Sequence, residues 1–185
     1  MKIRPHIPNV ITLFRILATA FLFWLPPFEV AFYVVYTVAG LSDALDGWLA
    51  RRLGMTSDLG ARLDSIADLL LYAVMLVKIL PELIRLLPGV IWLAVVAILL
   101  VRVGAYVVAA VKYHRFAALH TWMNKATGLL LFATPYLIGL PVFEAFCWTV
   151  CVVALMASGE ELVMHLTQKA YSAEVKTIFY GRKRV

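Results

Sequence analysis

Charged residues are scarce in this sequence, and their scarcity excludes a soluble globular domain. They make up 15% of the 185 residues, where about 25% is usual, while hydrophobic residues reach 63% against about 45–50%. A soluble fold of this size cannot hide so much apolar surface from water. We therefore expect lipid to surround much of the protein.

Cysteine and low-complexity sequence are equally sparse. Two cysteines are too few for a disulfide scaffold, and Cys147 and Cys151, one helical turn apart in an apolar stretch, are predicted to be packing residues. No low-complexity tract or internal repeat is visible. The net charge of +6 is compatible with nucleic acid, but the basic residues lie between apolar stretches and at both termini. This distribution favours anionic lipid headgroups and a phosphorylated substrate over nucleic acid.

Six apolar stretches are long enough, at about 20 residues, to cross a bilayer as helices. They cover 7–25, 30–49, 59–80, 89–111, 123–140 and 142–165, and a basic tail follows over 166–185. The first stretch is too long for a signal peptide, and prolines stand where its cleavage site should be. The sequence thus predicts an all-α integral membrane protein with six transmembrane helices in one domain.

The basic residues predict the orientation of these spans. Fourteen of the 17 lysines and arginines fall on one side of the membrane, among them Arg15 in the N-terminal group and Arg62 in the second-to-third connection. Cytoplasmic segments of membrane proteins carry such an excess of positive charge. We therefore expect both termini and the active site on the cytoplasmic side of the cell membrane.

All five aspartates of the chain fall within 26 residues, around the predicted cytoplasmic ends of the second and third spans. Asp43 and Asp46 are three apart and Asp64 and Asp68 are four apart, so each pair shares one face of a helix. Consecutive helices with a short connection are usually antiparallel neighbours. Four carboxylates are therefore predicted to converge.

Four like charges beside a low-dielectric region repel one another unless a cation neutralises them. Carboxylate oxygens without nearby cysteine or suitably spaced histidine favour Mg²⁺ or Mn²⁺ over zinc. Two divalent ions would balance the four charges and leave room for phosphates. The pattern indicates two-metal phosphoryl chemistry.

The neighbouring residues suit the same purpose. Gly47, Ala50 and Gly60 have little side-chain bulk where a ligand could approach, and Arg51 lies one turn beyond the carboxylates, where it can pair with a phosphate. Taken singly, each small residue could instead serve helix packing, and the arginine could instead anchor the helix to lipid headgroups.

These residues also carry a family resemblance. The stretch from Asp43 to Arg51, eight further residues and the stretch from Gly60 to Asp68 match D-x-x-D-G-x-x-A-R, eight residues, G-x-x-x-D-x-x-x-D at every fixed position. This pattern resembles the signature of the CDP-alcohol phosphotransferases. The resemblance implies a six-helix membrane enzyme, often a homodimer, that displaces CMP from a CDP-linked alcohol with a second alcohol.

By the same resemblance the site residues receive roles. Asp43, Asp46 and Asp64 would be principal metal ligands, and Asp68 would be both a ligand and the general base. Four further residues would line the CDP portion: Gly47, Ala50, Arg51 and Gly60.

The N-terminal sequence from Ile7 to Arg15 resembles bacterial phosphatidylglycerophosphate synthases, which implies CDP-diacylglycerol as donor and glycerol 3-phosphate as acceptor. Four basic residues are candidates for the acceptor phosphate: Arg102, Lys112, Arg115 and Lys125. Arg102 lies deep within a span, where a charge needs a negative partner, so a structural ion pair with the aspartates is an equal alternative. Positive-inside anchoring is as good an explanation for each of the others.

The sequence departs from that subfamily in several places. Ser65 and Leu69 replace the usual proline and lysine of D-P-x-x-D-K, and no Glu follows Arg102. The acceptor therefore stays open among glycerol 3-phosphate, serine, inositol phosphate, inositol and phosphatidylglycerol, and a CDP-choline or CDP-ethanolamine donor is an alternative. An ion-coupled transporter is the main alternative of another class. It would spread its carboxylates across the bilayer, whereas these cluster at one edge.

Overall fold

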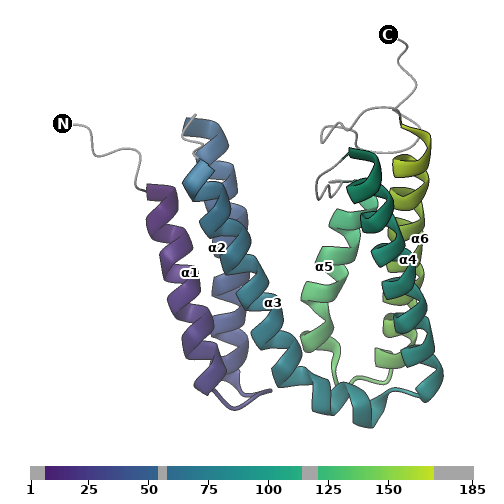
Figure 1. Ribbon diagram of the computed structural model, residues 1–185. Coiled ribbons are helices and arrows are strands. Elements are labelled where there is room, and N and C mark those ends of the chain that lie inside the picture. Colours follow the sequence, from purple (N-terminus) through teal and green to yellow (C-terminus); the bar gives the residue numbers. More distant parts are fainter. Residues whose placement is uncertain (1–6, 54–57, 114–120, 169–185) are drawn as a thin grey trace. The chain divides into compact units, whose positions relative to one another are not determined.

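The structure of the protein, a computed structural model, describes residues 7–53, 58–113 and 121–168. Regular structure in these ranges is helical throughout, which confirms the all-α prediction. The chain forms two compact units, residues 1–85 and 86–185. Six helices follow one another in the described residues (Figure 1): α1 (Ile7–Trp24), α2 (Val30–Leu53), α3 (Asp58–Leu86), α4 (Gly89–Tyr113), α5 (Trp122–Leu137) and α6 (Phe143–Thr167).

Prolines have different effects on the helices of the first unit. As predicted, α1 ends just before Pro26 and Pro27. Helix α3, however, runs through Pro81 to Leu86, beyond the predicted span of 59–80. A proline inside a helix removes one backbone hydrogen bond, but the bonds on either side of it hold the helix together. The prediction that the third stretch ends before Pro81 is therefore wrong for helix α3, which ends at Leu86.

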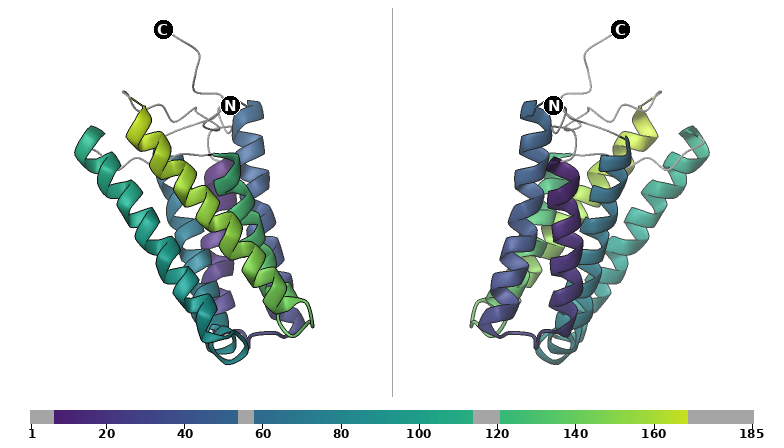
Figure 2. Two further views of the ribbon diagram at one scale, coloured as in Figure 1. Left: turned by 90° about the vertical axis from the view of Figure 1, so that its right-hand side faces the viewer. Right: turned by 90° about the vertical axis from the view of Figure 1, so that its left-hand side faces the viewer.

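On α1, α2 and α3, charged residues lie on the same helix face as buried residues. On each helix a buried residue lies seven positions, or about two turns, from a charged one. The pairs are Leu22 and Arg15, Tyr36 and Asp43, Leu71 and Asp64, and Met75 and Asp68. Helices α1 and α3 run in the same direction and α2 runs opposite to them (Figures 1 and 2). The ion pairs of Arg15 with Asp43, Asp64 and Asp68 show that these charged positions lie together.

In the second unit, α6 packs against both α4 and α5. Thr121 caps the N-terminus of α5, where its side-chain oxygen accepts a hydrogen bond of 3.2 Å from the backbone N–H of Asn124. A tight turn joins the last two helices, α5 and α6. Gly139 has a φ of 86° there, a left-handed conformation that glycine adopts without strain.

The inner face of α6 carries polar side chains. Ser158, Glu161 and His165 are buried and recur at intervals of three and four residues, which places them on one side of the helix. Cys147 and Cys151 are buried and unbonded to each other, as expected for packing residues.

Large apolar side chains lie on the outside of the described helices. Leu17 and Phe21 of α1 and Leu93 and Leu100 of α4 are more than half exposed. Helices α4 and α6 are each long and apolar enough to cross a membrane. Apolar surface of this extent suits contact with lipid chains. That all six stretches cross the bilayer stays a prediction.

Candidate active site

Three of the four predicted carboxylates converge at one end of the first unit. Asp43 comes from α2, and Asp64 and Asp68 come from consecutive turns of α3. Each offers one oxygen, and the three oxygens lie within 4.8 Å of one another. The side chains are 46%, 39% and 38% exposed, respectively. Asp46 is part of α2, but its side chain lies outside the described residues.

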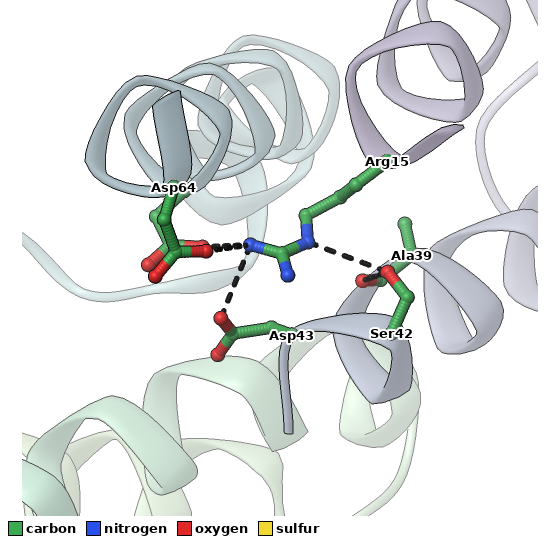
Figure 3. A network of polar contacts seen from close by, with 6 residues as sticks. Arg15, Ala39, Ser42, Asp43 and Asp64 are labelled. Carbon is green, nitrogen blue, oxygen red and sulfur yellow. Dashed lines mark hydrogen bonds and ion pairs between the residues drawn. The ribbon is translucent and has the colours of Figure 1, made fainter. Parts of the chain in front are cut away.

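Arg15 of α1 lies at the centre of this carboxylate cluster, which we define as Asp43, Asp64 and Asp68. Its side chain is 0% exposed, and its Nη1 atom lies 3.1 Å from Asp43 Oδ1, 2.9 Å from Asp64 Oδ1 and 2.8 Å from Asp68 Oδ1. On its other side Nε donates a hydrogen bond of 3.3 Å to Ser42 Oγ (Figure 3). A single guanidinium therefore joins α1 to both α2 and α3.

The interactions of Nη1 with the three carboxylates are not equivalent. The contacts to Asp64 and Asp68 are hydrogen bonds, and the contact to Asp43 is an ion pair. A guanidinium nitrogen of this kind carries two hydrogens, so it can direct good hydrogen bonds to two acceptors at most. The contact of this nitrogen with Asp43 is therefore electrostatic.

The sequence interpretation overlooked Arg15 as a site residue, because it counted this residue among the basic groups that set the membrane orientation. The available signal was the position of Arg15, eight residues into an apolar helix and seven residues before Leu22. A charged residue that lies on the same helix face as buried residues points into the interior of the protein. The aspartates were found because their spacing was conspicuous.

A second polar network lies in the other unit, around Arg102 of α4. Arg102 Nε donates to Ser158 Oγ at 3.2 Å, and its Nη2 atom donates to Asn124 Oδ1 at 2.8 Å. The amide nitrogen of Asn124 in turn donates to Glu161 Oε2 at 3.2 Å, and Glu161 is 0% exposed. Arg102 is thus linked through Asn124 to Glu161, a partner that the sequence interpretation did not foresee, and both described hydrogen bonds of Arg102 remain within the second unit.

The other basic candidates have different surroundings. Lys112 Nζ donates to the backbone oxygens of His165 at 2.8 Å and Leu166 at 2.9 Å, where the end of α6 leaves carbonyl groups without intrahelical partners. The exposed Lys125 lies over the Trp122 ring, with Nζ 5.1 Å from the ring centroid. Arg115 lies outside the described residues.

Comparison with known proteins identifies the family. Residues 5–158 match the family model for CDP-alcohol phosphatidyltransferase. The chain belongs to the CDP-alcohol phosphatidyltransferase family. It is accordingly a phosphatidyltransferase, an enzyme of phospholipid biosynthesis.

Three similar members of this family bear the name CDP-diacylglycerol–glycerol-3-phosphate 3-phosphatidyltransferase. The protein of that name from Pseudomonas fluorescens is 30% identical over 200 residues, which cover 97% of this chain and 96% of the relative. The one from Wigglesworthia glossinidia brevipalpis is 38% identical over 82 residues, 42% of this chain and 45% of the relative. The one from Escherichia coli K12 is 38% identical over 81 residues, 40% and 43% of the two chains.

In this phosphatidyltransferase the remaining signature positions flank the carboxylate cluster along the chain. Positions 47, 50 and 51 belong to α2, but their side chains lie outside the described residues. Gly60 lies in the first turn of α3, one turn before Asp64, and is partly exposed.

The cluster could hold a divalent cation, as the metal dependence of the family requires. Its donors are all carboxylate oxygens, which are the ligands that Mg²⁺ and Mn²⁺ prefer. Their partial exposure leaves a route for an ion from solvent. A cation held there would withdraw charge from a bound phosphate.

Proposed function

We propose that this enzyme transfers the phosphatidyl group of CDP-diacylglycerol to glycerol 3-phosphate and releases CMP. The observation that carries the proposal is the carboxylate cluster, in a chain that aligns over 97% of its length with a relative named for that reaction. The product would be phosphatidylglycerophosphate.

The reaction requires one bond to form and one to break. A hydroxyl oxygen of glycerol 3-phosphate attacks the phosphorus that carries the diacylglycerol, and the bond from that phosphorus to the CMP oxygen breaks. The hydroxyl is a weak nucleophile until its proton is removed, and we assign this step to a carboxylate oxygen of Asp68. The place of Asp68 in the carboxylate cluster, on a regular turn of α3, supports the assignment.

The other motif residues would bind the donor. We assign the metal to Asp43, Asp46, Asp64 and Asp68, with two Mg²⁺ or Mn²⁺ ions to balance the four charges. When bound, the ions would polarise the phosphorus and stabilise the CMP oxygen as it leaves. The CDP portion is assigned to the signature positions around them: Gly47, Ala50, Arg51 and Gly60.

For the phosphate of the acceptor we favour Arg102 over Lys112, Arg115 and Lys125. The two described partners of Arg102 are neutral oxygens, so its positive charge is not paired directly and can attract an anion. Lys112 already binds two carbonyl oxygens of α6.

The surroundings of the enzyme follow from the same reasoning. We propose a multi-pass protein of the cell membrane with both termini and the active site on the cytoplasmic side, supported by the exposed apolar surface and the distribution of basic residues. A homodimer is proposed from the family resemblance alone.

The test is an assay of CMP release and lipid product with the purified full-length protein, CDP-diacylglycerol and Mg²⁺ or Mn²⁺. The acceptors would be glycerol 3-phosphate, serine, inositol phosphate, inositol and phosphatidylglycerol, each supplied separately. We expect metal-dependent release with glycerol 3-phosphate and phosphatidylglycerophosphate as product. Release with a different acceptor alone would reassign the substrate. No metal-dependent release from this donor, CDP-choline or CDP-ethanolamine would overturn the enzymatic proposal.

A further inference from the structure

We infer that Arg15 is a built-in cation of the active site: it holds Asp43, Asp64 and Asp68 together in the metal-free protein and is displaced from them when a divalent ion binds. The inference rests on the proposed function in one respect, since it takes the carboxylate cluster to be the metal site. It assigns a role to a residue outside the signature motif.

The geometry supports competition for the same place. Nη1 of Arg15 lies at 2.8–3.1 Å from one oxygen of each carboxylate, at the point where a shared cation would be found. Oxygens on opposite sides of one Mg²⁺ are about 4.2 Å apart, because each Mg–O distance is about 2.1 Å. The three oxygens already lie within 4.8 Å of one another, so only a small contraction would let them share an ion. An ion and the guanidinium nitrogen cannot both occupy that point.

An ion would also suit this point better than the guanidinium does. Nη1 donates hydrogen bonds to Asp64 and Asp68, and its contact with Asp43 is an ion pair. A divalent cation has twice the charge and accepts oxygen ligands from several directions at once. The carboxylates would therefore exchange the guanidinium for the ion once an ion is available.

Burial indicates from which sides the two cations reach the cluster. The Arg15 side chain is fully buried, whereas the three carboxylates are between 38% and 46% exposed. An ion can therefore arrive from the exposed side while the arginine remains in the interior. Because the guanidinium is planar and rigid, Nη1 can leave this point only if the whole group turns. A turn that pivots about Nε would keep the hydrogen bond to Ser42 and would leave the guanidinium beside the outer oxygens of the metal-bound carboxylates. Ser42 is itself anchored, because its Oγ donates to the Ala39 backbone oxygen at 2.7 Å.

This role predicts the direction of a measurable change. Three neighbouring carboxylates repel one another, and the guanidinium relieves this repulsion in the metal-free protein. Its removal should destabilise the metal-free protein and strengthen metal binding, because the ion no longer competes with an internal cation. A merely structural Arg15 predicts the opposite for the metal, since a cluster that loses its organiser would bind the ion less tightly.

The experiment compares Mn²⁺ affinity among the wild type, Arg15→Met and Arg15→Lys, with full-length protein stripped by EDTA in detergent micelles. Free Mn²⁺ is measured by electron paramagnetic resonance, and circular dichroism and gel filtration check the fold. Arg85→Met is the matched control, since Arg85 also forms an ion pair within the first unit, with Glu82, but is exposed and outside the cluster.

We expect Arg15→Met to bind Mn²⁺ at least about tenfold more tightly than the wild type, as a neighbouring charge shifts such equilibria by one power of ten or more. Its unfolding temperature should fall in EDTA and rise more on Mn²⁺ addition than that of the wild type. Arg15→Lys keeps a positive charge with a shorter reach, so it should fall between the two and gives a folded comparison if Arg15→Met does not fold. Arg85→Met should match the wild type.

Unchanged or weaker Mn²⁺ binding in a folded Arg15 variant would overturn the inference, as would a wild type that binds no Mn²⁺. These measurements need no acceptor alcohol. A wild type that binds Mn²⁺ but transfers to an alcohol other than glycerol 3-phosphate contradicts only the proposed acceptor, so the two failures can be told apart.

Discussion

Arg15 and Arg102 form the same kind of hydrogen bond through Nε but contact different groups through their Nη atoms. Each uses Nε to donate to a serine, Ser42 at 3.3 Å or Ser158 at 3.2 Å. Each serine in turn donates to a backbone oxygen of its own helix, at 2.7 Å and 2.8 Å. At the far end of the guanidinium, Arg15 meets three carboxylates and Arg102 meets the neutral amide of Asn124.

This difference separates two uses of a positive charge in an apolar protein. The charge of Arg15 is paired directly, and the guanidinium serves to gather carboxylates. The described partners of Arg102 are neutral oxygens, and Glu161 is reached only through an intervening amide, so the charge of Arg102 can attract an incoming anion. Each of the following predictions breaks or sharpens this contrast.

The largest effect is expected for Asp68→Asn, which keeps the shape of the side chain but removes the proposed base. Turnover should fall about 10²- to 10⁴-fold, the usual contribution of general base catalysis. The measurement is kcat for CMP release, with Mn²⁺ binding followed in parallel and expected to persist. Glu161→Gln is the matched change in the second unit and should alter kcat far less. An equal loss in both variants would remove the contrast between the two networks.

A smaller effect is expected for Arg102→Met, which removes the proposed phosphate ligand. A hydrogen bond to a charged group contributes about 1.5–3 kcal/mol, so KM for glycerol 3-phosphate should rise about 10- to 100-fold. KM for CDP-diacylglycerol should stay near its wild-type value, and Arg85→Met should leave both constants unchanged. If both KM values rise together, Arg102 supports the fold and not the acceptor.

For Asn124→Leu we expect a loss of stability, because the amide connects Arg102 to the fully buried Glu161. Weakening the hydrogen bonding of a buried charged group costs about 1–3 kcal/mol. The unfolding temperature in detergent micelles should therefore fall. Thr149→Val is the control, since Thr149 is exposed on α6 and bonds only within its own helix among the described residues. Equal unfolding temperatures of the two variants would show that the amide of Asn124 contributes nothing to stability.

The smallest effects are expected for Ser42→Ala and Ser158→Ala, the two serine anchors. Each removes the acceptor of one guanidinium N–H, while the guanidinium keeps its other partners, so the two unfolding temperatures should decrease by similar, small amounts. Thermal unfolding of the two variants side by side measures this. A much larger decrease for one of them would show that the anchors are not equivalent.

Much of the site could be predicted from the sequence because helical periodicity decides which residues share a face. The intervals between Asp43 and Asp46 and between Asp64 and Asp68 fit one face of a helix, and three of the four side chains are found together in the structure. The fourth lies outside the described residues. The lengths of the apolar stretches also predicted the six helices to within a few residues at most of their ends.

Other features escaped prediction for two reasons: a helix can tolerate an internal proline, and some contacts join different helices. Pro81 was expected to mark the end of its stretch, yet α3 continues past it to Leu86. Arg102 was expected to pair with either a phosphate or the aspartates, but a partner on α6, reached through α5, was not foreseen. Such a link joins residues that are distant in sequence and follow no local spacing rule.

The sequence by itself determined an all-helical, lipid-compatible chain, its family and the convergence of the carboxylates, because composition, periodicity and motif spacing are local properties. Only the tertiary structure decided what lies among those carboxylates. Arg15 is 49 residues from Asp64 and 53 from Asp68, and only the folded chain brings its guanidinium within 2.9 Å and 2.8 Å of their carboxylates. A residue counted as one of many surface cations is therefore the buried centre of the site.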